Sequence, residues 1–90
     1  MLKIASTNQF LKDLKLVKRR NLPKSELDAV VKQLSEELPL LPKYKDHALK
    51  GNFAGYRECH IRPNWLLIYK IDKQILTLVL TRTGTHSDLF

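Results

Sequence analysis

The chain has 90 residues, and its 16 lysines and arginines outnumber 9 acidic residues to give a formal net charge of +7. This length allows one small domain over residues 1–90 and excludes a second hydrophobic core, while the single cysteine excludes an internal disulfide. With neither a signal peptide nor the roughly 20 apolar residues of a membrane span, we expect a cytoplasmic protein whose basic surface meets a polyanion, either nucleic acid or an acidic protein segment.

The first 21 residues predict a short strand and then a helix. Residues 1–5 are partly apolar and predict an edge strand, and Ser6 or Thr7 can cap the helix that follows. Apolar residues then recur three and four positions apart, and Asn21 is a plausible stop. The remaining surface of this helix is basic and carries Lys12, Lys15, Lys18, Arg19 and Arg20. These cations form either a solvated face or a stripe that follows phosphates, and both interpretations stay open.

A second helix is predicted after a short connection. Pro23 suits the first turn of a helix, and Ser25 with Asp28 resembles a capping box. Pro39 and Pro42 end the helix. The 3.6-residue period is followed by Leu27, Val30, Val31, Leu34 and Leu38. We expect the two helices to form an antiparallel hairpin packed on one face of a sheet.

Three strand-like runs fill most of the second half. After a loop over residues 40–52, they cover residues 53–61, 65–71 and 75–82, separated by three-residue turns. Such short connections favour an antiparallel meander. The predicted fold class is therefore α+β, with two N-terminal helices packed on a twisted antiparallel sheet of about four strands. Cys59, within the first run, is expected to be a small buried hydrophobic residue.

Alternation of side chains along the strands limits which polar groups can meet. Tyr56, Glu58 and His60 share one face, because successive side chains point to opposite faces. One face of the last strand is predicted to carry Leu76, Leu78, Leu80 and Arg82. If the helices cover one face of the sheet, Glu58 and His60 line the other. Arg82 would then end the neighbouring strand, with His86 just beyond.

The reactive side chains gather in the same half of the sequence. His47, His60 and His86 are the only histidines, and Arg82 and the terminal Phe90 accompany them. Histidine exchanges protons near neutral pH, arginine can hold a phosphate bidentately, and an aromatic ring can stack on an unpaired base. These groups suit metal-free RNA cleavage. The histidines lack a compact ligand spacing, so we expect no metal ion and no other cofactor.

Three sequence blocks carry a family resemblance, namely YKDHALKG at 44–51, GYRECHIRPNWLLIYK at 55–70 and RTGTHSDLF at 82–90. In order and spacing they resemble the YafQ branch of the RelE/ParE toxin superfamily, while the helical half matches only in pattern. The resemblance implies a RelE-like fold, a toxin of a type II toxin–antitoxin system, and an endoribonuclease that cleaves mRNA in the ribosomal A site. It implies as partners a cognate antitoxin, mRNA and the ribosome, with operator DNA bound only through the antitoxin, and no membrane.

The resemblance also suggests which residues act. It implies a catalytic set of His47, Glu58, His60, Arg82 and His86. Substrate contacts are expected from Lys50, Arg57, Trp65 and Phe90. Relatives commonly have aspartate immediately before the Trp or Leu, where this chain has Asn64. Asparagine can neither act as a base nor carry negative charge, so any role of that aspartate is lost here.

We assign roles by chemistry as a hypothesis. His86 is the general acid and His60 or His47 the base, with Glu58 orienting an imidazole or favouring its charged form. Arg82 clamps the scissile phosphate and Phe90 stacks on a base.

Structural interpretations compete with these roles. Arg82 could instead pair with Asp88 or Glu58, Phe90 could be a tucked-in terminus, and Trp65 could belong to the core. Two other functions also stay open. A ParE-like toxin poisons DNA gyrase by binding and needs no catalytic histidines, and a basic nucleic-acid-binding module would not cleave at all.

Overall fold

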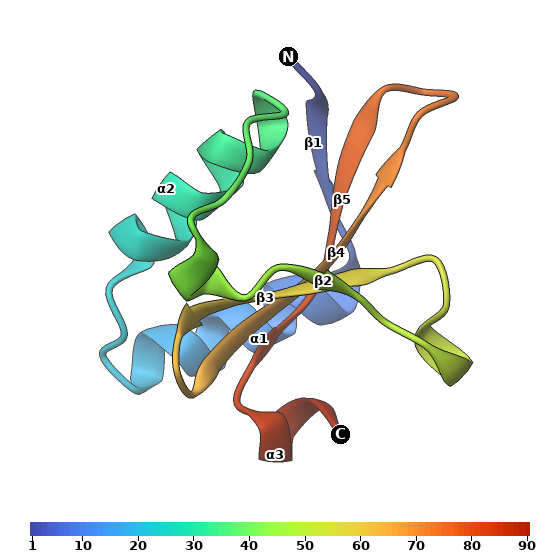
Figure 1. The fold of residues 1–90 in the computed structure, drawn as a ribbon. Coiled ribbons are helices and arrows are strands. Elements are labelled where there is room, and N and C mark those ends of the chain that lie inside the picture. The colour runs from blue at the N-terminus through green and yellow to red at the C-terminus, as the bar shows by residue number, and fades with distance from the viewer.

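Five strands form one mixed sheet in the order β1-β5-β4-β3-β2 (Figure 1). The computed structural model describes every residue from 1 to 90. The strands are β1 (Lys3–Ser6), β2 (His47–Ala48), β3 (Arg57–Arg62), β4 (Trp65–Asp72) and β5 (Thr77–Gly84). The helices are α1 (Asn8–Arg19), α2 (Lys24–Ser35) and α3 (His86–Leu89), and two 3₁₀ turns are η1 (Pro42–Tyr44) and η2 (Gly51–Phe53).

The predicted α+β class is confirmed, with two differences in the sheet. There are five strands rather than about four, because the two-residue β2 is too short to leave an alternating pattern. The pairs among β2, β3, β4 and β5 are antiparallel, but β1 lies parallel to β5. No hairpin joins β1 to β5, so chain connectivity does not impose an antiparallel pair on them. The 12-residue helices are too short and too polar for any of them to cross a bilayer.

The helix ends follow local signals only in part. Thr7 caps α1, because its hydroxyl accepts a hydrogen bond from the Phe10 amide at 3.0 Å. Asn21 adopts a left-handed conformation just after α1, as expected for a stop. The capping box predicted from Ser25 and Asp28 is wrong. Both residues lie inside α2, whose N-cap is Pro23 without a side-chain bond.

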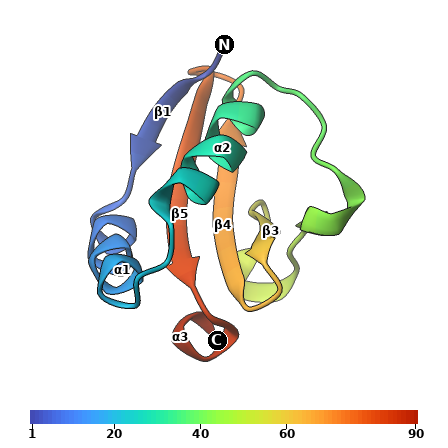
Figure 2. The ribbon, with the colours of Figure 1, turned by 90° about the vertical axis from the view of Figure 1, so that its left-hand side faces the viewer.

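The two long helices do not form the predicted antiparallel hairpin. Figure 2 shows α1 end-on beside the edge of the sheet, while α2 is seen from the side, crossing in front of β5 and β4. Helix α1 packs mainly against β5. The left-handed residue Asn21 redirects the chain between the helices, so each helix packs on the sheet at its own angle.

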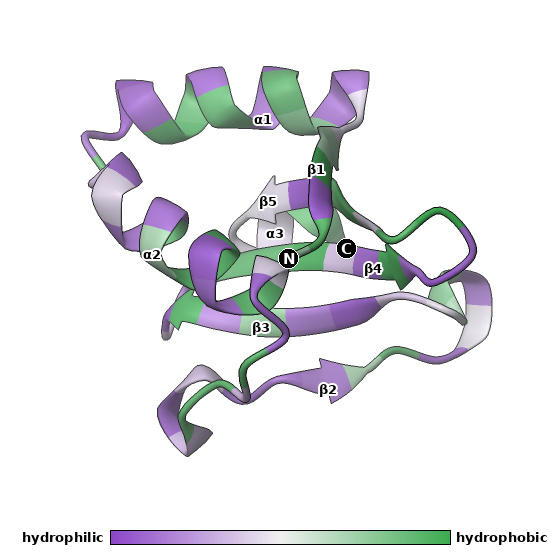
Figure 3. Ribbon diagram, turned by 90° about the horizontal axis from the view of Figure 1, so that it is seen from above, coloured by the Kyte–Doolittle hydropathy of each residue, from purple (hydrophilic) through white to green (hydrophobic).

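One face of the sheet holds the main core. The helices bury Phe10, Val17, Leu27, Val30 and Leu34 against Cys59, Trp65, Leu67, Tyr69, Leu78 and Leu80. Figure 3 shows the central strand β4 as hydrophobic along most of its length, whereas the edge strand β2 is largely hydrophilic. Cys59 is fully buried, as predicted, and burial raises the pKa of its thiol to about 12. It therefore stays a neutral thiol at physiological pH.

A bulge in β5 changes which face the end of that strand presents. Leu80 pairs with Tyr69, but Ile68 pairs with Arg82, so Thr81 is an extra residue. Tyr69 and Ile68 point to opposite faces of β4. The prediction that Leu80 and Arg82 share a face is therefore wrong, because alternation cannot foresee a bulge. Leu76 also lies outside the strand, in an exposed turn with φ of +49°.

The end of β5 is fastened to α1 by one buried carboxylate. Asp13 accepts hydrogen bonds from Arg82 Nε at 3.0 Å, Arg82 Nη2 at 3.1 Å and the Thr83 amide at 3.2 Å. Its side chain is only 9% exposed. The hydrogen bonds from the guanidinium to Asp13 raise the pKa of Arg82. Asp13 thus ties a helix from the start of the chain to a strand from its end.

We expect Asp13→Ala to destabilise the protein by about 2 kcal/mol, because it leaves a buried amide and a guanidinium without their acceptor. For a domain of this size that loss lowers the melting temperature by roughly 8–16 °C. Asp28→Ala is the matched control, since Asp28 only pairs with Lys24 in an exposed i,i+4 contact. Equal melting temperatures for the two variants would show that Asp13 does not hold the fold together.

Candidate active site

The polar face of the sheet is built around one buried carboxylate. Glu58 pairs across the strands with His47 on β2 and with Ile68 on β4, and Ile68 pairs with Arg82 on β5. These residues form one row on the face opposite the main core. His60, two positions after Glu58, lies on the same face. The predicted gathering of Glu58 and His60 away from the helices is therefore what the structure shows.

Two imidazoles flank the Glu58 carboxylate. Its Oε1 lies 3.7 Å from His47 Nε2 and 3.6 Å from His60 Nε2, and the side chain is only 5% exposed. The outer nitrogens meet carbonyl oxygens, with His47 Nδ1 2.7 Å from Lys45 O and His60 Nδ1 3.3 Å from Pro63 O. A carbonyl can only accept, so each Nδ1 carries a proton. In the neutral ring Nε2 then has a free lone pair and can act as a base.

The C-terminal residues bring a third imidazole and an aromatic ring to this face. The His86 ring centre lies 6.3 Å from that of His60 and 5.6 Å from that of Phe90. Phe90 in turn meets Phe53 edge-on at 5.5 Å. Phe90 is 59% exposed, so it contacts the protein on one side and presents the rest of its ring to solvent. This exposure argues against a fully tucked-in terminus.

Short polar contacts fix α3, which carries His86. Asp88 accepts from Arg20 Nη1 at 2.6 Å and Nη2 at 3.1 Å, and from the Thr85 amide at 2.9 Å. The Thr85 hydroxyl accepts from the Asp88 amide, which completes a capping box. Arg20, and then Thr85, hold the pKa of Asp88 far below its ordinary range. Gly84 leaves the necessary room, since a Cβ there would lie 2.8 Å from Asp88 Oδ2.

Arg82 shares the face with the histidines, and neither of the two partners named in the competing structural interpretation holds it. Neither Asp88 nor Glu58 is its partner, because Asp13 takes both Nε and Nη2 of the guanidinium. Asp13 precedes Arg82 by 69 residues, so no local pattern predicts this pair. The remaining nitrogen, Nη1, has no partner among the hydrogen bonds of the structure. Arg82 is therefore held in place at the α1 side of the face with one edge free to meet an anion.

Two residues expected to contact substrate lie on the other face. Trp65 is buried in the main core, where its indole nitrogen donates to Thr83 Oγ1 at 2.9 Å. Arg57 pairs with Tyr69 across the strands and bonds to Asp46 on the core side. The geometry does not bring either side chain to the histidines, because both sit at core-facing positions of their strands.

Lys50, the remaining predicted substrate contact, and Asn64, the departure from the family pattern, both lie in exposed segments. Lys50 lies between β2 and η2, and Asn64 in the turn that joins β3 to β4, next to the Pro63 carbonyl that His60 meets. Of the basic residues of α1, Lys12, Lys15, Lys18 and Arg19 are exposed and outside every ion pair, and Arg20 pairs with Asp88.

Sequence reasoning missed the side chains that hold the site together. Asp46 accepts hydrogen bonds from the Tyr69 hydroxyl and from Arg57, which anchors the loop that presents the adjacent His47. This contact spans 23 residues and leaves no local signal. The pairing of Thr85 with Asp88 did have a signal, because a threonine three residues before an aspartate is the capping-box pattern. No group of three or more His, Cys, Asp or Glu side chains is arranged to hold a metal ion.

The chain has close relatives along its full length. A family model described as a bacterial toxin of type II toxin–antitoxin system, YafQ, matches residues 2–90. The mRNA interferase toxin YafQ of Escherichia coli strain K12 is 41% identical over 88 residues, which is 97% of this chain and 94% of that protein. A metal-bound toxin from Helicobacter pylori is 49% identical, with a TM-score of 0.95 and full coverage of both chains. The E. coli DinJ–YafQ complex contains a chain that is 40% identical, with a TM-score of 0.89 and coverage of 100% and 99%.

We expect Asp88→Asn to loosen α3, because an amide cannot form the ion pair with Arg20. The measurement is the set of nuclear Overhauser contacts between the Phe53 and Phe90 rings, which should weaken or disappear. Asp28→Asn, which neutralises an exposed carboxylate on α2, should leave them intact. Unchanged ring contacts in Asp88→Asn would show that the ion pair does not position the tail.

The pH dependence of the same contacts follows from the lowered pKa of Asp88. A carboxylate with a depressed folded-state pKa contributes its full stabilisation above its unfolded value, about 3.9, and loses it only as the pH falls through the lower value. The wild-type ring contacts should therefore persist from neutral pH to about pH 4 and weaken only below that.

Proposed function

The chain belongs to the YafQ family of bacterial toxins of type II toxin–antitoxin systems, and from this membership we propose that it is an mRNA interferase, an endoribonuclease that cleaves translated mRNA in the ribosomal A site. The observation that carries the proposal is the cluster around Glu58, where two imidazoles meet one buried carboxylate and a third imidazole lies 6.3 Å beyond. Imidazoles accept and donate protons near neutral pH, as general acid–base catalysis requires.

The proposed reaction uses the 2′-hydroxyl of the RNA as nucleophile. His60 Nε2 removes the hydroxyl proton, since the ring's own proton is on Nδ1, which faces the Pro63 carbonyl. The 2′-oxygen then attacks phosphorus and the bond from phosphorus to the 5′-oxygen breaks. Glu58 stabilises the imidazolium that forms. His47, which contacts the same carboxylate oxygen, either orients Glu58 or takes the role of base itself.

His86 is the proposed general acid. Its ring lies across from His60, so the two imidazoles can flank one phosphodiester, and it gives a proton to the departing 5′-oxygen. Phe90 stacks on the base of a neighbouring nucleotide with its exposed ring and so aligns the strand. Arg82 offers its free Nη1 to the phosphate while Asp13 fixes the rest of the guanidinium.

The proposed role of the ribosome is to position the RNA, which the site by itself does poorly. The cluster lies on an open sheet face, and Asn64 stands where relatives commonly have aspartate. A short, open site of this kind positions a flexible RNA poorly by itself, and positioning can supply much of the rate. We propose that the ribosome supplies it by holding the codon in place.

The proposed regulatory partner is a cognate antitoxin, as the name of the E. coli DinJ–YafQ toxin–antitoxin complex indicates for that relative. The net charge of +7 suits an acidic or amphipathic antitoxin segment that folds on binding. Operator DNA would be bound by the antitoxin and not by this chain.

Cleavage should leave a 2′,3′-cyclic phosphate on one fragment and a 5′-hydroxyl on the other, because the adjacent 2′-oxygen displaces the 5′-oxygen. Mapping the transcript ends after induced expression tests this, and a 2′-deoxy nucleotide at the mapped position should block cleavage. A 3′-hydroxyl with a 5′-phosphate would indicate attack by water and would exclude the proposed chemistry. Intact transcripts with broken DNA would instead indicate a gyrase poison.

His86→Ala should reduce the cleavage rate on programmed ribosomes by about 10²–10⁴-fold, because a positioned general acid contributes on that scale. Ser87→Ala is the matched control, since Ser87 is the exposed neighbour of His86 in α3. Full activity of His86→Ala would remove His86 from the mechanism. Absence of cleavage by the wild type, with retained RNA affinity, would favour a binding module.

A further inference from the structure

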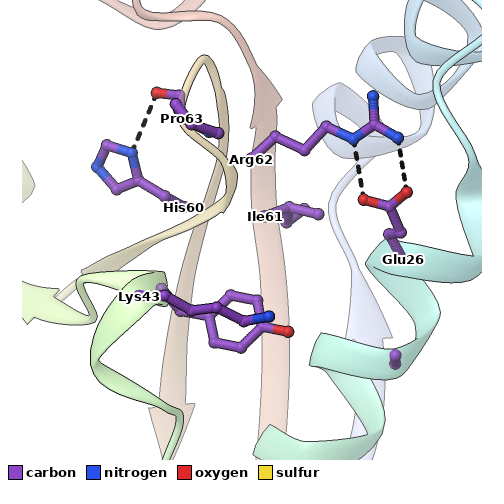
Figure 4. A pocket seen from close by; sticks show the side chains of 8 residues that line it. Glu26, Lys43, His60, Ile61, Arg62 and Pro63 are labelled. Carbon is purple, nitrogen blue, oxygen red and sulfur yellow. Dashed lines mark hydrogen bonds and ion pairs between the residues drawn. The ribbon is translucent and has the colours of Figure 1, made fainter.

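A groove opens beside His60, at the part of β3 that β2 does not pair with. It has a volume of about 500 Å³ and lies between α2, the 3₁₀ turn η1 and the end of β3. Strand β2 pairs only with Arg57 and Glu58, so the outer edge of β3 is free from Cys59 onward. Figure 4 shows His60 and Pro63 on one side of the groove and the ion pair of Arg62 with Glu26 on the other.

The groove contains a cation and an aromatic ring side by side. Lys43 Nζ lies 5.1 Å above the centre of the Tyr44 ring. Lys43 is exposed and takes part in no ion pair, whereas Arg62 is neutralised by Glu26 at 2.6 Å. Lys43 can therefore leave the ring for a stronger anionic partner. This movement would expose the face of the half-buried Tyr44.

The groove is continuous with the catalytic cluster through one residue. His60 lines the groove, and the same ring contacts Glu58 and lies 6.3 Å from His86. A strand whose scissile phosphate sits between His60 and His86 can place its next nucleotide at the mouth of the groove, because His60 borders both. The volume of about 500 Å³ falls in the range of small-molecule sites, about 300–1,000 Å³, and admits one nucleotide.

We propose that this groove binds a nucleotide of the substrate strand next to the scissile bond, with its base stacked on Tyr44 and its phosphate held by Lys43. The inference rests on the proposed nuclease function. It assigns substrate-binding roles to two residues of η1 that precede the catalytic histidines in the chain.

The composition of the groove favours RNA over an antitoxin peptide. Glu26, Lys43, His60 and Arg62 line it, so charged and polar groups of a ligand find partners there. A free cation beside an aromatic ring is instead the pair of contacts by which proteins hold single strands, one for the phosphate and one for the base. The neighbouring hollow, lined by Leu40 and Leu41 among others, is the apolar one.

The test measures binding of a short, unstructured, fluorescently labelled oligoadenylate in the His86→Ala background, so that cleavage does not interfere. Tyr44→Leu should weaken binding by about 5- to 30-fold through loss of stacking, and Tyr44→Phe should restore it. Lys43→Gln should lower the slope of log affinity against log salt by about 0.7, the value for one phosphate contact with a single strand. Lys73→Gln, in the exposed β4–β5 turn, is the charge-matched control.

Four outcomes would overturn the proposal. Lys43→Gln and Lys73→Gln could change the salt slope equally, or folded Tyr44→Leu could bind like wild type. The variants could bind the oligonucleotide as tightly as wild type but bind the antitoxin more weakly, which would make the groove a peptide site. The variants could also bind the oligonucleotide as tightly as wild type but bind vacant ribosomes more weakly, which would assign the groove to ribosomal RNA.

Cleavage by the wild type is measured separately, so the two proposals fail in different ways. Groove-dependent RNA binding without any cleavage supports the nucleotide site and rejects the nuclease. Cleavage on ribosomes with unchanged RNA binding in Tyr44→Leu and Lys43→Gln rejects only the nucleotide site.

Discussion

The extra residue at Thr81 determines where the C-terminal part of the chain goes. Up to Leu80, the side chains of β5 alternate in step with the core, and Leu78 and Leu80 pack under the helices. The bulge reverses this order, so that Arg82 pairs with Ile68 on the polar face. The chain then leaves the sheet on that side, which places His86 and Phe90 beside His60. Without the bulge, Arg82 would point into the main core.

Carboxylates then secure each segment that carries a candidate site residue. Asp13 fixes Arg82 from α1, Asp88 fixes α3 through Arg20, and Asp46 fixes the loop of His47 through Tyr69. In each case the partner is distant in sequence, so closing the loop between the two residues costs chain entropy. The other contacts of the folded state must offset that cost. A chain this small has a thin stability margin, so the loss of any one of these contacts removes a sizeable part of its stability.

The catalytic proposal and the groove proposal share His60. Its Nδ1 meets the Pro63 carbonyl of the β3–β4 turn, and its Nε2 meets Glu58 inside the sheet. The same ring closes one side of the groove that holds Lys43 and Tyr44. A basic, aromatic approach that leads to a row of imidazoles is a coherent path for a single RNA strand. The two proposals together place the chemistry and the substrate contacts of this small domain on one edge.

The sequence by itself determined the two long helices, the strands β1, β3, β4 and β5, and the order of these elements, but neither β2 nor α3. Hydrophobic spacing marked both long helices and the central strands, Thr7 and Asn21 bounded α1, and three matched blocks identified the family. These signals are local, because helices and strands repeat every few residues. Tertiary structure alone decided the bulge at Thr81, the parallel pairing of β1 and the partner of Arg82. Those depend on strand register and on contacts between residues far apart in the chain, which no local period encodes.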